Sequence, residues 1–222
     1  IGLISSKLSL EGPIIKDKTS FIVSARRTYI DLLARPIIKA AAKSNGSEGT
    51  GGYFFYDVNA KINHKINESN RVYLSGYFGD DKFYANTKDT YLNNGVENVY
   101  DSENSLKWGN IITALRWNSL INDKLFSNLT ATYSQYEFNV GGESKYDGFD
   151  LEKQEYFSRI RDYGLRLDYE YAPVSNHNVK FGASFTRHDF KPGVLQFQGS
   201  DDGVSFDSIL NLSNNILSND MY

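Results

Sequence analysis

Apolar and polar residues alternate along residues 53–66 with a period of two, as in a strand whose two faces differ. The apolar positions are Phe54, Tyr56, Val58, Ala60, Ile62 and Ile66, and the polar ones are Asp57, Asn59, Lys61, Asn63 and Lys65. The same alternation recurs along most of the chain, in segments longer than an ordinary strand of about five or six residues. We therefore predict an all-β protein whose strands form the wall of a transmembrane β-barrel, with the apolar positions facing lipid.

Short turn-forming segments and long polar segments alternate between the expected strands. The short segments are residues 12–18, 67–70, 122–124 and 173–176, and the long ones are residues 29–52, 81–105, 141–155 and 192–222. Bacterial outer-membrane barrels have short periplasmic turns and long extracellular loops. The order predicts an antiparallel barrel wall of about eight consecutive strands in this chain.

The last two expected strands show the two faces most clearly. Outward positions are Tyr163, Leu165, Leu167, Tyr169, Tyr171, Val179, Phe181, Ala183 and Phe185, and inward positions include Asp162, Arg166, Asp168, Glu170 and Lys180. An unpaired charge facing hydrocarbon is costly, so the inward set must face water or compensating charge. If Leu165 and Phe181 were packed into a sealed dry interior, the barrel interpretation would fail.

Composition narrows the alternatives. The aromatic content of 14% favours β structure, and the mean hydropathy of -0.47 does not decide for or against a barrel, whose lumen and loops are polar. No apolar run reaches the roughly 18 residues of a transmembrane helix. The net charge of -3, from 24 basic and 27 acidic residues, gives no footprint for nucleic acid.

The first long segment contains an apolar, helix-compatible stretch at residues 29–43, which Pro36 interrupts. We expect one or two short helical turns there. The glycine-rich residues 46–52 are expected to be a flexible linker into the next strand.

Several segments resemble the barrel of TonB-dependent receptors. They are residues 8–13 (LSLEGP), 24–31 (SARRTYID), 73–81 (YLSGYFGDD), 106–110 (LKWGN), 115–118 (LRWN) and 125–128 (LFSN). The resemblance is greatest to the receptors that carry a carboxypeptidase-regulatory-like domain before the plug. These segments belong to the wall and rim of the barrel, so they indicate a family without locating a site.

The resemblance implies an active importer in the outer membrane of a Gram-negative bacterium. Such a receptor has a barrel of about 22 strands filled by a plug domain, and TonB supplies the energy through a short periplasmic box. Its expected partners are TonB, the plug domain, outer-membrane lipid, a surface lipoprotein and a small, scarce nutrient: an iron chelate, a vitamin, a glycan or a peptide. Because only about eight strands are recognised here, and neither plug nor TonB box, we expect residues 1–222 to be part of such a barrel domain.

Five inward positions are candidates for contact with a ligand in the lumen: Arg26, Tyr73, Tyr77, Tyr136 and Arg166. A guanidinium can bind a carboxylate with two hydrogen bonds, and tyrosine rings can stack on sugars. A second aromatic set near strand ends suits an interfacial girdle, namely Tyr53, Tyr56, Trp108, Tyr169 and Tyr171.

The sequence contains no arrangement typical of a catalytic, cofactor or metal site. His64, His177 and His188 lack metal-ligand spacing, and the glycines before residue 53 precede a strand, where a phosphate loop would precede a helix. We expect no enzyme activity and no cofactor.

Two other interpretations remain open at this stage. One is a complete eight-stranded outer-membrane barrel with an anchoring or adhesive role. The other is a soluble β-sandwich that binds carbohydrate, in which a second sheet would cover the apolar stripes. A chain that stays in solution as a compact monomer without detergent would favour the sandwich over the two barrels.

Overall fold

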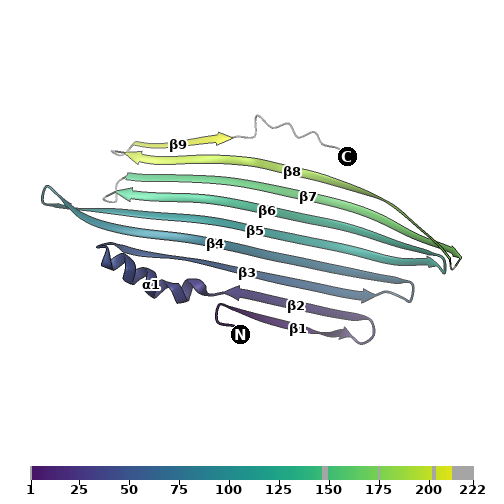
Figure 1. The fold of residues 1–222 in the computed structure, drawn as a ribbon. Coiled ribbons are helices and arrows are strands. Elements are labelled where there is room, and N and C mark those ends of the chain that lie inside the picture. The colour runs from purple at the N-terminus through teal and green to yellow at the C-terminus, as the bar shows by residue number, and fades with distance from the viewer. Residues whose placement is uncertain (1, 147–149, 175, 202–203, 212–222) are drawn as a thin grey trace.

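The computed structural model describes residues 2–146, 150–174, 176–201 and 204–211. It contains nine antiparallel strands in one open sheet, and each strand pairs with its neighbours in sequence (Figure 1). The strands are β1 (Ser5–Ile15), β2 (Thr19–Thr28), β3 (Glu48–Lys65), β4 (Asn70–Asn93), β5 (Val96–Asn122), β6 (Leu125–Tyr146), β7 (Asp150–Val174), β8 (His177–Asp201) and β9 (Val204–Asn211), and one helix, α1 (Ile30–Ser44), follows β2. The expectation of an all-β antiparallel fold is confirmed, with nine strands where about eight were expected.

Tight turns close one end of the sheet, which we call the lower end. Asn67 Oδ1 accepts hydrogen bonds from the Ser69 backbone N–H and the Asn70 side chain, both at 3.0 Å, between β3 and β4. Asn122 Oδ1 accepts from the Lys124 N–H at 2.9 Å between β5 and β6. These asparagines hold the chain in turns through their own side chains, and the lower turns are as short as the sequence predicted.

The predicted long loops at the opposite, upper end are wrong where the structure describes them. Residues 81–105 form the ends of β4 and β5, which are 24 and 27 residues long and meet at Asn94–Gly95. Both turn residues have positive φ, 52° and 81°, as a two-residue hairpin turn requires. Nearly all of residues 141–155 and 192–211 are likewise strand, while residues 147–149 and 212–222 lie outside the described residues.

The helix also differs from its prediction. α1 is one continuous helix of 15 residues with Pro36 inside it, because strong helix formers such as Ala34 and Ala40 flank the proline on both sides. It lies beside the upper part of β3, beyond the end of β2 (Figure 1). Gly49 and Gly52 of β3, in the segment expected to be a linker, allow this close approach: a Cβ on Gly52 would lie 2.8 Å from the Asp31 Cβ.

The sheet has no dry centre. None of the apolar side chains in the described part of the chain is fully buried. Leu165 is 52% exposed and Phe181 55%, so the side chains chosen as the test of the barrel interpretation are not packed inside the protein. No helix among the described residues has the length and apolar character to span a membrane.

Candidate functional site

The strand register aligns the apolar positions of eight strands on one face of the sheet, which we call the outward face. The aligned side chains include Leu8 and Leu10; Phe21, Val23 and Ala25; Val58, Ala60 and Ile62; Val72, Leu74 and Phe78; Ile111, Leu115 and Trp117; Leu129, Ala131 and Tyr133; Tyr163 to Tyr171 at alternate positions; and Val179, Phe181, Ala183 and Phe185. The alternation in residues 53–66 and in β7 and β8 predicts those sets one strand at a time, and the register joins them with the others. The result is one apolar band that crosses the sheet.

This apolar band runs obliquely to the strands. We call residues that lie opposite one another on successive strands a row. The uppermost band residue on β2, Ala25, is in the row of Arg161 of β7. The uppermost band residue on β8, Phe185, is in the row of Leu165, four residues lower on β7. Its lower limits, Phe21 and Val179, lie in the rows of Leu165 and Tyr171 and so differ by six residues. A shift of four to six residues over six strand spacings corresponds to a tilt of about 25–35° between the strands and the normal to the band.

The polarity of the two faces inverts above the band. On the lower parts of the strands the outward side chains are apolar and the inward ones polar, as in Leu165 beside Arg166. On the upper parts Lys82, Lys107 and Asn139 face outward, and their neighbours Phe83, Leu106 and Val140 face inward. The outward face is therefore apolar only along a limited height. On β7, from Tyr163 to Tyr171, this height is about 26 Å along the strand.

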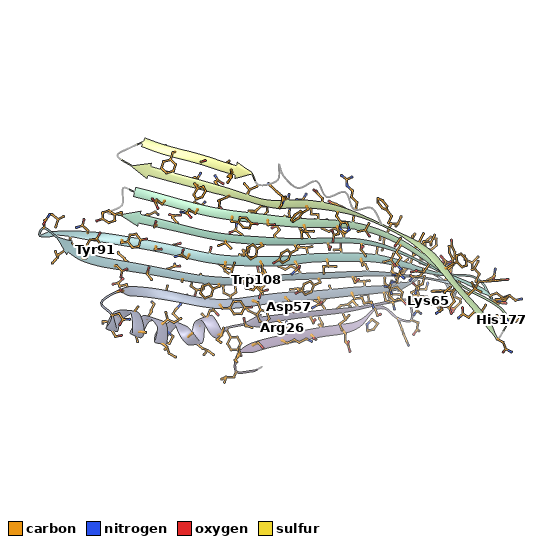
Figure 2. The ribbon with its side chains drawn as sticks, turned by 45° about the horizontal axis from the view of Figure 1, so that its top comes forward. Arg26, Asp57, Lys65, Tyr91, Trp108 and His177 are labelled. Atoms are coloured by element: carbon orange, nitrogen blue, oxygen red, sulfur yellow. The ribbon has the colours of Figure 1, made fainter. Side chains whose placement is uncertain are left out.

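All five candidate lumen residues lie on the inward face, which is the face of the sheet opposite the outward face. Arg26 makes an ion pair with Asp57 of β3 at 2.7 Å and also lies over the Phe55 ring at 4.8 Å (Figure 2). Asp57 is the more buried partner, with a side chain only 12% exposed. Its partners indicate that Arg26 ties β2 to β3, and no anion from outside is needed to compensate its charge.

The other four candidates do not converge. Tyr73 packs under Lys61, whose Nζ lies 5.3 Å from the ring centre, and Arg166 pairs with Asp168 of its own strand at 2.8 Å. Tyr136 shares a row with Arg26 but is four strands away, or about 19 Å at ordinary strand spacing. Tyr77 lies one inward row below. The structure therefore confirms that these residues share a face but does not bring them together as one site.

The predicted aromatic girdle is only partly outward. Tyr56, Tyr169 and Tyr171 face outward, but Tyr53 and Trp108 lie on the inward face, where their rings stack at 6.1 Å. Tyr53 and Trp108 lie above the band, where the apolar and aromatic side chains switch from the outward to the inward face. Burial, together with a 2.5 Å hydrogen bond that the hydroxyl donates to Asp81, raises the pKa of Tyr53 to about 12.

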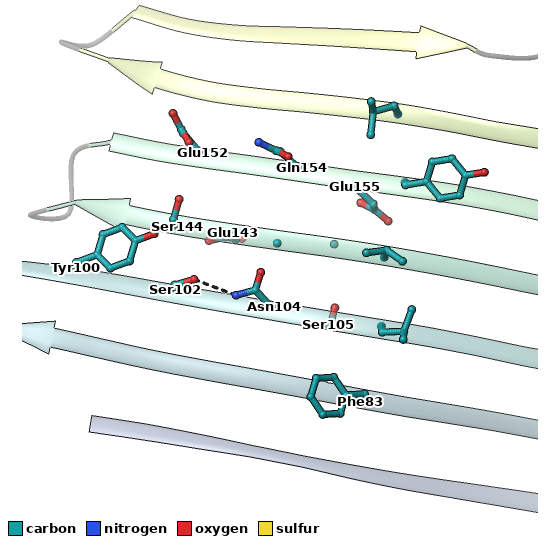
Figure 3. A pocket seen from close by; sticks show the side chains of 16 residues that line it. Phe83, Tyr100, Ser102, Asn104, Ser105, Glu143, Ser144, Glu152, Gln154 and Glu155 are labelled. Carbon is teal, nitrogen blue, oxygen red and sulfur yellow. Dashed lines mark hydrogen bonds between the residues drawn. The ribbon is translucent and has the colours of Figure 1, made fainter. Parts of the chain in front are cut away.

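The upper inward face holds a depression that the sequence did not reveal (Figure 3). Its volume is about 640 Å³, in the range of ligand sites. One hydrogen-bonded row supplies an apolar shelf made of Phe83, Leu106, Val140, Tyr156 and Leu195, from five neighbouring strands. The Tyr156 hydroxyl donates to the Pro192 carbonyl oxygen at 3.0 Å, which fixes the ring at the edge of this shelf.

Polar side chains occupy the rows above the shelf. Asn104 and Gln154 share the next row, and Ser102, Ser144 and Glu152 share the one after it. Asn104 donates a hydrogen bond to Ser102 Oγ at 3.1 Å, as the dashed line in Figure 3 marks. Glu152 is the glutamate on the inward face here, whereas Glu143 and Glu155 occupy outward positions and pair with Lys145 and Lys153. No lysine or arginine lines the depression. The depression therefore suits an uncharged or cationic group with one apolar face and several hydrogen-bonding groups.

One sequence signal could have revealed the depression. On β4 the apolar positions are even-numbered up to Phe78 and odd-numbered from Phe83, and on β5 they change from Ile111 and Leu115 to Leu106 and Trp108. Such a change of phase places the upper apolar residues on the opposite face of a continuous strand. Because polar residues surround this change, the sequence alone predicts a loop at residues 81–105.

The histidines do not assemble a metal site. His64 shares a 2.8 Å hydrogen bond with the Thr19 hydroxyl, and His188 lies 2.7 Å from Asp162. Among the described residues, no three side chains of the metal-binding types cluster. Comparison of the chain with protein-family models, with curated proteins and with solved structures finds no match.

Proposed function

We propose that the chain is part of the barrel wall of an outer-membrane transporter of the TonB-dependent kind, which imports a scarce nutrient. The observation that carries the proposal is the oblique apolar band. No part of the described chain covers it, and its tilt of about 25–35° approaches the tilt of about 35–45° of strands in membrane barrels. At the derived tilt its height on β7 is about 23 Å, close to the roughly 25 Å apolar belt of such barrels.

The inward face supports a wide barrel. Its lower part carries charged groups such as Arg166 with Asp168, and Glu170 with Lys180 at 3.3 Å. In a barrel of about eight strands the interior is filled by side chains, which leaves little room for water around such groups. Because the nine strands form an open sheet whose edges are β1 and β9, we infer that further strands of the same protein complete a larger barrel.

The depression suggests what the transporter takes up. An apolar shelf beneath amide, hydroxyl and carboxylate groups matches a sugar ring or a peptide better than an anionic chelate, since no cation lines it. We infer that the upper inward wall contacts the nutrient before import. By the resemblance described above, import would follow displacement of a plug driven by TonB.

Spin labels on paired outward and inward positions test the wall. The sequence has no cysteine, so single cysteines in the complete protein give unambiguous labels. We compare Leu165→Cys with Arg166→Cys, and Phe181→Cys with Lys180→Cys, in lipid bilayers. Labels at 165 and 181 should collide with lipid-soluble oxygen, and labels at 166 and 180 with a water-soluble nickel reagent. Equal exposure of both members of a pair to the nickel reagent would overturn the proposal.

A growth test addresses the nutrient. We expect deletion of the gene to slow growth on particular glycans or peptides, and a gene with Phe83→Ala and Gln154→Ala to restore growth poorly. Asn86→Ala, on the outward side of the same strand as Phe83, serves as the matched control and should restore growth fully. Full growth with the double variant would remove the depression from the transport route.

A further inference from the structure

Cations gather on the outward face immediately above the apolar band. On β7 and β8 they are Arg159, Arg161, Arg187 and Lys191, which we call the basic cluster. Arg187 follows Phe185, the top of the band on β8, by one outward position, and Arg161 follows Tyr163 on β7 in the same way. The cluster thus lies where the outward face changes from apolar to charged.

Two members of the basic cluster are held close together despite their like charge. Arg159 lies directly opposite Lys191 across the two strands, and both lie against the ring of Phe157, at 5.8 and 5.6 Å from its centre. Like charges directly opposite one another destabilise a sheet. Glu137, 3.7 Å from Arg159, compensates one of the two. The arrangement therefore has room for another anion.

The remaining cations make no close ion pair among the described residues, although Asp189 shares their face. The Arg161 Nε donates to the neutral Gln135 side chain at 2.9 Å. Among the described residues, no carboxylate lies within 4.0 Å of Arg161, Arg187 or Lys191. Asp189, opposite Arg161 in the register, makes no ion pair with it. Three exposed or half-exposed cations are thus available to a ligand on one side of the wall.

The lower limit of the same band has a different character. On β7 and β8 its outward side chains are Tyr169, Tyr171, Val179 and Phe181, all uncharged. Lys16, Lys18 and Lys124 at this end lie in the turns, so the outward lysines and arginines next to the band on β7 and β8 lie at its upper boundary.

We propose that the basic cluster binds the anionic phosphate of a membrane lipid in the leaflet at the upper boundary of the band. This inference depends on the proposed function, because lipid must cover the outward face. Guanidinium groups bind phosphate oxygens through paired hydrogen bonds, and cations beside a membrane attract anionic lipids. The acyl chains would lie on Tyr163, Leu165 and Phe185, directly below.

The test uses the complete protein in phosphatidylcholine bilayers, with lipid A, a bisphosphorylated glucosamine lipid, as the probe. Retained lipid is measured by native mass spectrometry as the probe is titrated. The variant R161Q/R187Q/K191Q should bind the probe roughly a hundredfold more weakly than the wild type, since each of the three cations contributes about a fivefold factor. The control K16Q/K18Q/K124Q removes three exposed lysines of the lower turns and should bind as the wild type does.

The single variant R187Q should fold normally, because Arg187 is exposed and makes no ion pair with the described residues. Its affinity for the probe should fall about fivefold. Equal affinity of the wild type and the triple variant would overturn the inference, as would displacement of the probe by inorganic phosphate, which would indicate a site for free anions. A wild-type protein that enters bilayers without preferring the probe overturns this inference alone. One that enters no bilayer overturns the proposed function.

Discussion

The lower and upper parts of the same strands are built with opposite polarity. Within the apolar band the outward face is apolar and the inward face carries charge, whereas above the band Lys82 faces outward and Phe83 inward. Backbone pairing continues through this change without interruption on β4 and β5. The polarity of the side chains on the two faces therefore changes at this level, and the backbone hydrogen bonding does not.

This difference separates two roles in one wall. Under the proposed function, lipid covers the lower part over a limited height, which accounts for the apolar side chains at nearly every outward position. The upper part is free of that demand, and its outward face carries the basic cluster while its inward face forms the depression. A change that alters one part should leave the other intact, which the following experiments examine.

The largest effect is expected from a charge in the apolar band. Ala60 is an outward residue in the middle of the band on β3, and Asn59 beside it faces inward. Ala60→Arg should lower the free energy of unfolding in a bilayer by about 2–4 kcal/mol, the cost of arginine near the midplane. Asn59→Arg should change it by less than about 0.5 kcal/mol.

Denaturant titration of the protein in lipid vesicles measures both variants of β3. Similar losses for Ala60→Arg and Asn59→Arg would mean that the two faces share one environment. The distinction between a lipid-facing band and a wet interior would then have to be given up.

A smaller effect, confined to the upper part, is expected at Gly193. Its φ of 149° is unfavourable for other residues, and a Cβ would lie 2.7 Å from the Tyr156 ring. Gly193→Ala should destabilise the upper part of β7 and β8 by about 1–3 kcal/mol. Hydrogen exchange should accelerate at residues 152–157 and 194–198 while residues 163–171 keep their protection. Acceleration along the whole of both strands would show that the two parts unfold together.

The lower part of this fold could be predicted from the sequence, and the upper part could not. Around Leu165 and Phe181 apolar and polar side chains occupy opposite faces, so alternation reveals both the strand and which residues share a face. Around Asn86 and Ser102 polar residues occupy both faces, which removes the contrast on which the prediction rests. The Asn94–Gly95 pair is the remaining local signal of a hairpin there, and a polar loop contains such pairs as well.

The candidate site followed the same division. Alternation sufficed to predict that Arg26 and Tyr73 share one face of the sheet, because each lies in an alternating segment. The depression was missed because its shelf joins five strands in one row, from Phe83 to Leu195, and only the register reveals that row. The sequence predicts too short a helix because Pro36 disfavours helix locally, whereas the alanines that follow it favour helix strongly enough for the helix to continue.

A more modest effect is expected where the two parts join. Asp57, nearly buried, pairs with Arg26 at 2.7 Å, while Asp168, lower on the inward face and 36% exposed, pairs with Arg166 at 2.8 Å. Asp57→Asn should cost about 1–2 kcal/mol of stability, and Asp168→Asn less than about 1 kcal/mol. Chemical denaturation of the two variants in the same vesicles compares them. Equal losses would show that burial at the junction adds nothing to the Arg26 pair.

The smallest effect concerns protonation of Tyr53 in the upper part. Burial, then its hydrogen bond to Asp81, raises the pKa of Tyr53 from the ordinary 10.0 to about 12. Because the folded protein holds this proton more tightly than the unfolded chain does, the resulting stabilisation is complete below pH 10 and is lost between pH 10 and about 12. Tyr53→Phe should therefore remove one late step from an alkaline titration of tyrosinate absorbance and flatten the fall in stability over that interval. If the step persisted in Tyr53→Phe, the stacked and hydrogen-bonded position of this ring on the inward face would be wrong.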